Sequence, residues 1–287
     1  MLSAALAERN IDAWGFCRAG WEISSRQRVN GGVKKTTMVA SEICALIADA
    51  LDGVTFAVGD VRRAMMRDDA FACEVVGNIM QEWLQGWLDK NGIDYALNPN
   101  TQMPPDFYLS PEDRKRNLLE VKAFNYKASP GFDIADFRMY AEEIIREPYM
   151  LDVDYLIFGY EMGDDGVVTI RKVWLKKVWE ITRRMAKWPL NLQVKKKVVN
   201  KIRPGVWYAK KPRDFHTFSC LEDFVSAVEE TCYRNPATRE TLAPEWKPDF
   251  LAAYERFYGK PLQIPHWNEI EKKYCVPKLA KMRGKKS

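Results

Sequence analysis

The stretch "PPDFYLSPEDRKRNLLEVKAF", residues 104–124, decides the fold, because two short apolar segments stand on either side of a polar turn. Ser, Pro, Asp and Asn in "SPEDRKRN" favour a turn, so the flanking segments are predicted to pair as antiparallel strands. In "LLEVKAF", side chains alternate between faces, and Leu119, Val121 and Ala123 are expected in the core. Glu120 and Lys122 then share the other face, about 7 Å apart, and such a pair on an apolar strand needs a chemical explanation.

The explanation that we favour involves a second carboxylate. Asp106 stands near the start of the first strand, where a hairpin can bring it beside Glu120. Two crowded carboxylates repel each other, so either one is protonated or a cation lies between them. Oxygen ligands without histidine select a hard ion such as Mg²⁺. Lys122 beside that ion could hold or deprotonate a water molecule, with its pKa lowered by the metal and by burial, and these groups together suit hydrolysis of a phosphodiester.

The charge of the chain indicates a polyanionic partner. The 287 residues carry a net charge of +5, and residues 181–213 hold eleven lysines and arginines without a single acid. Residues 272–287 hold seven more, again without an acid. A solvated surface and a frayed tail are the alternative interpretation, and we favour it for the tail. Apolar and aromatic residues are interleaved through residues 181–213, which favours binding there.

Residue usage excludes several classes of protein. The chain has only two histidines, too few for a multi-histidine zinc site or a paired-histidine phosphodiesterase. Its six cysteines form no C-x-x-C pair and are expected to be reduced core thiols of a cytoplasmic protein. The first ten residues lack the basic start of a signal peptide, and no apolar run approaches the roughly 18 residues of a membrane span.

The hydrophobic pattern predicts an α/β (α+β) fold with a mixed central sheet flanked by helices. We expect one domain over residues 1–287, with a catalytic core at about 68–215 and helical extensions at 1–67 and 216–287 that contribute to DNA recognition or dimerisation. Five prolines in the last 45 residues predict short helices and loops there. Helices are expected at 38–52, 68–90, 133–147, 176–185 and 221–235, and strands at 94–99, 105–109, 118–124, 153–162, 167–175 and 198–209.

Pro105 and Asp106, followed after thirteen residues by Glu120, Val121 and Lys122, resemble the PD-(D/E)-x-K motif. This motif marks a superfamily of Mg²⁺-dependent nucleases that includes most type II restriction endonucleases. The resemblance implies that Asp106, Glu120 and the Val121 carbonyl hold Mg²⁺, for which Mn²⁺ can substitute. It also implies that Lys122 positions or activates the attacking water. The context agrees, because both parts of the motif lie on apolar strands that are adjacent in the chain.

Members of this superfamily often carry a glutamate on an upstream helix, where it completes the metal or water shell. Glu74 best matches that role in the helix predicted at 68–90, and Glu82 is the alternative; either could instead be a surface carboxylate. Residues 70–210 further resemble type II restriction endonucleases of the NgoBV/NlaIV kind. That resemblance implies a homodimer in the prokaryotic cytosol that cuts both strands of duplex DNA at a short, GC-rich palindrome.

The basic block at 181–213 contains two kinds of candidate DNA contact. Lysines are expected to meet phosphates, whereas Gln193 can pair with adenine and Arg203 with guanine. Pro204 would fix the backbone that aims Arg203, although a structural ion pair is an equal alternative. Should Arg203 not read a base, the glycine-containing loop at 24–37 is the next candidate. The predicted DNA-binding residues are Gln193, Lys195, Lys196, Lys197, Lys201, Arg203, Arg28, Lys34 and Lys35.

Two other functions stay open at this point. The same fold could serve DNA repair or structure-specific nicking, and cleavage of plain duplex DNA at one short palindrome would favour restriction instead. The chain could also be a non-enzymatic DNA-binding protein in which Glu120 and Lys122 form an internal salt bridge. That interpretation leaves Asp106 without a role.

Overall fold

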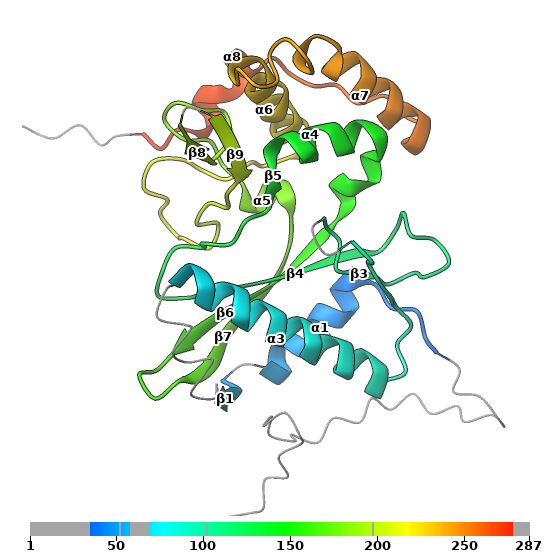
Figure 1. Ribbon diagram of the computed structural model, residues 1–287, viewed down its shortest axis with the longest axis vertical. Helices are drawn as coiled ribbons and strands as arrows, with labels where there is room; N and C mark the ends of the chain where they lie inside the picture. Colours follow the sequence, from blue (N-terminus) through cyan, green and yellow to red (C-terminus); the bar gives the residue numbers. More distant parts are fainter. Residues whose placement is uncertain (1–34, 52, 58–68, 101–102, 197, 278–287) are drawn as a thin grey trace, which may run out of the picture. The chain divides into compact units, whose positions relative to one another are not determined.

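The computed structural model describes residues 35–51, 53–57, 69–100, 103–196 and 198–277 (Figure 1). The chain forms two compact units, the first made of residues 1–135 and 146–178 and the second of residues 136–145 and 179–287. Among the described residues, no helix has the length and apolar character needed to cross a membrane. The expected single domain with a core at about 68–215 stays a prediction.

The first unit is built on a mixed sheet with the strand order β1-β7-β6-β4-β3-β2. β4 pairs in parallel with β6, and its other neighbour, β3, runs antiparallel to it. The helices and strands of this unit are α1 (Ala40–Leu51), β1 (Thr55–Ala57), α3 (Asp69–Lys90), β2 (Ala96–Leu97), β3 (Phe107–Tyr108), β4 (Leu118–Asn125), the 3-10 helix η1 (Pro148–Asp152), β6 (Asp154–Met162) and β7 (Val167–Lys177).

Helices α1 and α3 cover one face of this sheet, as Figure 1 shows for α3 in cyan. Apolar residues recur at helical spacing along α3, where Val76, Met80, Leu84 and Leu88 are fully buried. They belong to the same core cluster as the inward-facing residues of β4 and β6. The amphipathic pattern therefore sets which face of α3 packs on the sheet, and a helix in a protein gains most of its stability from such packing.

The second unit consists mainly of helices, with a small sheet of strand order β5-β9-β8. Its core is aromatic: Trp246 stacks on Phe250 with ring centroids 5.2 Å apart, and the Trp246 indole donates a 2.8 Å hydrogen bond to the Ala141 carbonyl. Its elements are β5 (Ala135–Asp136), α4 (Phe137–Arg146), α5 (Val178–Ile181), β8 (Leu192–Lys195), β9 (Val198–Ile202), α6 (Leu221–Arg234), α7 (Ala243–Tyr258), α8 (Trp267–Ile270) and the 3-10 helix η2 (Glu271–Tyr274).

Most of the predicted elements are confirmed, including the α/β class, the mixed sheet with helices and the hairpin around residues 110–117. The helix predicted at 176–185 is wrong over most of its length. Lys176 and Lys177 continue β7 because they pair with Tyr155 and Asp154 of β6, and only Val178–Ile181 is helical. The short helices predicted for the C-terminal residues are also wrong for α7, which spans 16 residues.

The length of α7 follows from its apolar side chains. Trp246, Phe250 and Tyr254 recur at four-residue spacing and are all buried, so one face of the helix packs continuously over its whole length. Pro248 lies inside the helix, where it removes one backbone donor, and the burial of the aromatic face outweighs that loss.

Candidate active site

Asp106 lies directly before β3, and both of its carboxylate oxygens accept hydrogen bonds. The backbone N–H of Val121 in β4 donates to Oδ2 at 2.7 Å. The side-chain amide of Gln81 in α3 donates to Oδ1 at 3.1 Å. The β3–β4 hairpin and helix α3 thus fix this carboxylate from two sides, at the level of the E-V-K segment.

Glu120 and Lys122 occupy the middle of β4, and Lys122 Nζ lies 2.6 Å from Glu120 Oε1. The two side chains are only 6% and 22% exposed. The other carboxylate oxygen, Glu120 Oε2, is buried and has no hydrogen-bond partner among the described residues. A buried carboxylate oxygen without a donor is costly, so this oxygen is available to a ligand that supplies positive charge.

The predicted faces of β4 are confirmed, since Leu119, Val121 and Ala123 lie in the core cluster against α3. Leu118 and Phe124, which flank Glu120 and Lys122 on the other face, are fully buried as well. β4 is therefore a central strand with apolar surroundings on both faces. This position explains why the side chains of Glu120 and Lys122 are largely buried.

The pKa values of Asp106 and Lys122 are both raised, for different reasons. Burial raises the pKa of Asp106 to about 7, and repulsion from Glu120 adds to that shift. Burial acts to lower the pKa of Lys122, but attraction to Glu120, Asp106 and Asp133 outweighs it, and the pKa lies above its ordinary value. The expectation of a lowered Lys122 pKa is therefore wrong as far as the protein's own groups are concerned, because three carboxylates surround the ammonium.

The donor set fits a hard divalent cation. Among the described residues, no three His, Cys, Asp or Glu side chains are grouped closely enough to form a complete protein cage for a metal. Mg²⁺ does not need one, because it is usually held by one or two carboxylates and completes its shell with waters and phosphate oxygens. Two crowded carboxylates, one with a raised pKa and one with an oxygen that lacks a donor, are the arrangement that such an ion would relieve.

The upstream helix supplies a residue that sequence reasoning missed, since Gln81 bonds to Asp106 whereas its neighbour Glu82 is exposed. Gln81 follows Glu74 by seven residues, and seven residues of α-helix return to within about 20° of the same face. That spacing would have identified Gln81 if amide side chains had been considered together with acidic ones. The side chain of Glu74 lies outside the described part of the chain, so its role stays a prediction.

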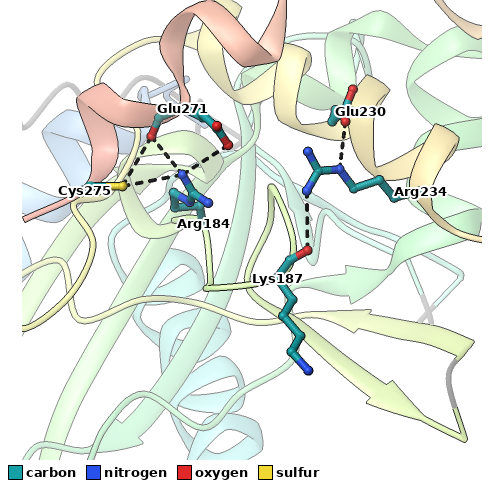
Figure 2. A network of polar contacts seen from close by, with 6 residues as sticks. All are labelled: Arg184, Lys187, Glu230, Arg234, Glu271 and Cys275. Carbon is teal, nitrogen blue, oxygen red and sulfur yellow. Dashed lines mark hydrogen bonds and ion pairs between the residues drawn. The ribbon is translucent and has the colours of Figure 1, made fainter.

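The basic block at 181–213 does not act as one uniform surface. Figure 2 shows Arg184 enclosed by its partners: it is nearly buried, and its Nη1 lies 3.0 Å from the Glu271 carbonyl and 3.4 Å from the Glu271 carboxylate. Arg234 in the same figure is bonded to Glu230 at 2.7 Å and reaches the Lys187 carbonyl at 3.5 Å. Arg184 therefore stabilises the second unit and is not free to bind a polyanion, whereas Arg234, which lies outside the block on α6, holds the backbone of Lys187 within it.

Most of the remaining DNA-binding candidates lie on the β8–β9 hairpin. Gln193 in β8 stands opposite Lys201 in β9, and both are half-buried. Lys195 and Lys196 are exposed at its tip. Arg203 follows β9, and its backbone N–H donates to the Asn191 carbonyl at 2.8 Å.

Three candidates, Arg28, Lys34 and Lys197, lie outside the described residues. Lys35 is described and is exposed; its ammonium lies 3.7 Å from Asp94 and 6.0 Å from the centre of the Tyr95 ring.

Comparison with known proteins agrees with the geometry. The family model described as NgoBV restriction endonuclease matches residues 38–274. The type II restriction enzyme NlaIV of Neisseria lactamica is 59% identical over 228 residues, which cover 79% of this chain and 91% of that protein. The type II restriction enzyme NgoBV of Neisseria gonorrhoeae is 47% identical over 171 residues, 60% of this chain and 89% of that protein.

A solved structure of the NlaIV restriction endonuclease is also similar, with a TM-score of 0.75 at 54% identity, covering 85% of this chain and 99% of that one. The resemblance predicted for residues 70–210 is thus confirmed, and the match extends well beyond them on both sides. The chain belongs to the NgoBV restriction endonuclease family.

Proposed function

We propose that this chain is a type II restriction endonuclease that hydrolyses both strands of duplex DNA at a short palindrome. The observation that supports this most directly is the buried Glu120–Lys122 pair beside Asp106, with one carboxylate oxygen left without a donor. Family membership supports the same activity, because the similar proteins NlaIV and NgoBV are type II restriction enzymes.

The residues of the site would divide the work of hydrolysis. Mg²⁺ held by Asp106, Glu120 and the Val121 carbonyl would supply a Lewis acid and lower the pKa of a bound water. Lys122 would hold the attacking water and direct it at phosphorus. The new P–O bond forms as the bond to the 3′ oxygen breaks, leaving a 5′ phosphate and a 3′ hydroxyl. Glu74 would support the metal or the water from α3.

The non-enzymatic alternative fits this site less well. An internal salt bridge accounts for Glu120 Oε1 and Lys122, but it leaves Glu120 Oε2 without a donor. It also gives no reason for a second buried carboxylate, Asp106, whose pKa rises to about 7 through burial and, to a smaller extent, through repulsion from Glu120. Replacing a buried ion pair by apolar residues is often neutral or stabilising, so stability alone does not explain these groups.

The deciding experiment is digestion of a plasmid of known sequence with the purified protein and Mg²⁺, followed by mapping of the ends. Restriction predicts cuts in both strands at one short, GC-rich palindrome in plain duplex DNA. Nicks confined to mismatches, flaps or damaged bases would instead indicate a repair or structure-specific nuclease. Tight DNA binding without any cut would favour the non-enzymatic alternative.

A homodimer would explain how one catalytic site per chain cuts two strands. A palindrome offers the same half-site twice, and a two-fold protein meets it with one surface used twice. Sedimentation of the DNA complex should give two chains per duplex. One chain per duplex would mean that a monomer nicks the two strands in turn.

Contacts with DNA are proposed for the β8–β9 hairpin, with its lysines on phosphates and with Gln193 and Arg203 on bases. Lys195→Ala should weaken binding to all duplexes alike and lower the salt slope by about one. Arg203→Ala should cost roughly 1–3 kcal/mol on the cognate site and little on other DNA. Equal weakening on cognate and random duplex would show that Arg203 does not read a base and would move attention to Arg28, Lys34 and Lys35.

A further inference from the structure

We propose that Lys172 of β7 binds a backbone phosphate of the DNA strand that is cut and thereby positions the scissile phosphate beside Lys122. This inference rests on the proposed function, because it takes duplex DNA as the substrate. It goes further by assigning a substrate-positioning residue to the first unit, outside the basic block at 181–213 that the sequence indicated.

The register of the sheet places Lys172 on the same face as Glu120 and Lys122. Phe124 of β4 is level with Gly159 of β6, which is level with Lys172 of β7. Residues that are level across paired strands point to the same face, and Phe124 shares the face of Lys122, two positions before it. Two strand spacings of about 4.8 Å and one two-residue step of about 7 Å put the Cα atoms of the two lysines roughly 12 Å apart.

A β-bulge in β7 turns Lys172 to this face. The pairing of β6 with β7 skips Arg171, which is the extra residue of the bulge. Ile170 and Val173 both pack in the core cluster under α3, although strict alternation would place residues three apart on opposite faces. The bulge therefore leaves Arg171 and Lys172 together on the face that carries the catalytic groups. Bulges are frequent beside active sites, where they re-aim side chains in this way.

Lys172 stands beside two other cations that share one carboxylate. Arg171 donates to the Glu161 carboxylate at 3.1 and 3.2 Å, and the Lys127 ammonium lies 3.6 Å from the same group. Lys172 is exposed, and the ion pairs formed among the described residues do not include it. Three cations around a single acid leave a net positive charge at the surface, which suits a polyanion.

Aromatic packing between β7 and β4 holds Lys172 at a fixed distance from Lys122. Trp174, two positions along β7 from Lys172, stacks on Phe124 with ring centroids 5.7 Å apart. Its indole lies over Gly159, where a Cβ would come within 2.7 Å of the ring. The two strands are thus joined across the glycine. A phosphate bound at Lys172 would therefore orient the strand at Lys122 without a large cost in ordering the protein.

The position of Lys172 favours the strand that is cut over any other polyanion. Successive phosphates of one strand are about 3.4 Å apart along the axis of the duplex, so roughly 12 Å corresponds to a few nucleotides. A duplex whose scissile phosphate lies at Lys122 carries other phosphates of the same strand at about that distance. A lysine there would fix the register of the strand and carry no sequence information.

The test compares Lys172→Ala with Lys90→Ala, which removes the same charge from an exposed position at the end of α3, the helix that packs on the opposite face. Steady-state cleavage is measured in Mg²⁺ on a short duplex centred on the mapped cut site, over a series of salt concentrations. Lys172→Ala should raise KM roughly tenfold with a smaller effect on kcat, and should lower the salt slope by about one. Lys172→Arg should restore most of the loss, and Lys90→Ala should behave as the wild type.

Uncharged methylphosphonates then locate the contact. Each duplex of a series carries one such group in the cut strand, at a position other than the scissile phosphate. With the wild type, one substitution within a few nucleotides of the cut should raise KM by about the same factor as Lys172→Ala. With Lys172→Ala, the same duplex should show no further loss, because the two partners of one contact are not additive.

Two outcomes would overturn the inference in an enzyme that cuts. Lys172→Ala could retain the KM and the salt slope of the wild type, or its loss could add to that of every methylphosphonate, so that no single phosphate is its partner. Absence of cleavage by the wild type would instead overturn the proposed function, and this inference with it. The two kinds of failure are therefore distinguishable.

Discussion

Lys122 reaches only one oxygen of Glu120, at 2.6 Å, and leaves the other buried without a hydrogen-bond partner among the described residues. The two residues are separated by a single position on β4, so the strand itself sets their spacing. An ion pair that served only stability would satisfy both oxygens, because a buried unpaired oxygen costs more than the pair gains. The proposed binding of a divalent cation would supply the missing partner of this carboxylate oxygen.

Asp106→Ala, Glu120→Ala and Lys122→Ala should each lower the rate of plasmid cleavage by orders of magnitude while DNA binding survives. Each change removes a group that would hold the metal or the water in the transition state. Initial rates on a linearised plasmid are the measurement. Glu142→Ala is the control, since it breaks an exposed ion pair with Arg138 and should cut at the wild-type rate. Full activity in Asp106→Ala or Lys122→Ala would sink the assignment.

Cleavage should require Mg²⁺ or Mn²⁺, stop on addition of a chelator and resume when Mg²⁺ is restored. Ca²⁺ should support binding without turnover, because it is larger and its coordination is looser. The measurement is cleavage and anisotropy in parallel, on the same duplex, across the three ions. Undiminished cleavage in excess chelator would rule out the proposed role of Asp106 and Glu120.

Asp106→Asn should stabilise the protein at neutral pH in the presence of a chelator, by an amount that depends on pH. The pKa of Asp106 is about 7 in the fold and 3.8 in its unperturbed form, so folding favours the protonated acid. The stability of the wild type therefore falls as pH rises from about 4 to about 7 and stays lower above that range. Asparagine does not titrate, and its amide can bond to Gln81 once that side chain flips.

Thermal unfolding of both proteins across this pH range checks the prediction. The gap in melting temperature should open with rising pH and become constant above pH 7. Asp249→Asn, at an exposed position on α7, should show no such trend. A gap of the same size at every pH would mean that Asp106 does not titrate in this way.

Gln81→Ala should raise the Mg²⁺ concentration needed for half-maximal cleavage several-fold, with little change in melting temperature. Gln81 donates to Asp106 Oδ1 and so holds the carboxylate in one orientation; without it, part of the metal's binding energy goes into ordering that side chain. A titration of cleavage rate against Mg²⁺ is the measurement. Glu82→Ala, one position along and exposed, is the matched control and should leave the curve unchanged. The reverse result would make Glu82 the residue that acts from α3.

Gly159→Ala should destabilise the first unit by about 1–3 kcal/mol through overpacking. A Cβ at this position in β6 would lie 2.7 Å from the Trp174 ring, which stacks on Phe124 with centroids 5.7 Å apart. Urea unfolding measures the loss. Gly86→Ala in α3 is the control: a Cβ there meets nothing within 4 Å, and alanine should stabilise the helix by up to about 1 kcal/mol. Equal stability of Gly159→Ala and wild type would contradict this account.

Much of the fold could be predicted because its signals are local. The 3.6-residue period of α3 and the turn residues between β3 and β4 depend only on neighbours in the chain, and both predictions are confirmed. The helix predicted to begin at residue 176 is wrong there because residues 176 and 177 pair with Tyr155 and Asp154, which are distant in sequence. This pairing extends β7 into a stretch whose apolar residues have helical spacing. Tertiary pairing there overrides local preference, which a single sequence does not show.

The candidate site was predictable where its chemistry is carried by acids and a lysine in a recognisable pattern. Gln81 was not predicted because its amide is uncharged and because its contact with Asp106 spans 25 residues of sequence. Arg184 was counted within a basic surface, whereas it is buried against Glu271, 87 residues later in the chain. Sequence shows which residues are charged, but only the packed structure shows which charges are already neutralised.

The place of Glu120 and Lys122 within a paired strand constrains how this protein can tolerate insertions and deletions. Adding or removing one residue inside Leu118–Asn125 would exchange the two faces of β4 and send both side chains into the core under α3. The turn at residues 110–117 lies outside the ladder with β6 and can change length without moving them. The number of residues between the Pro-Asp pair and Glu120 therefore depends on the length of the turn. The single residue between Glu120 and Lys122 is instead fixed by the pleat of the strand.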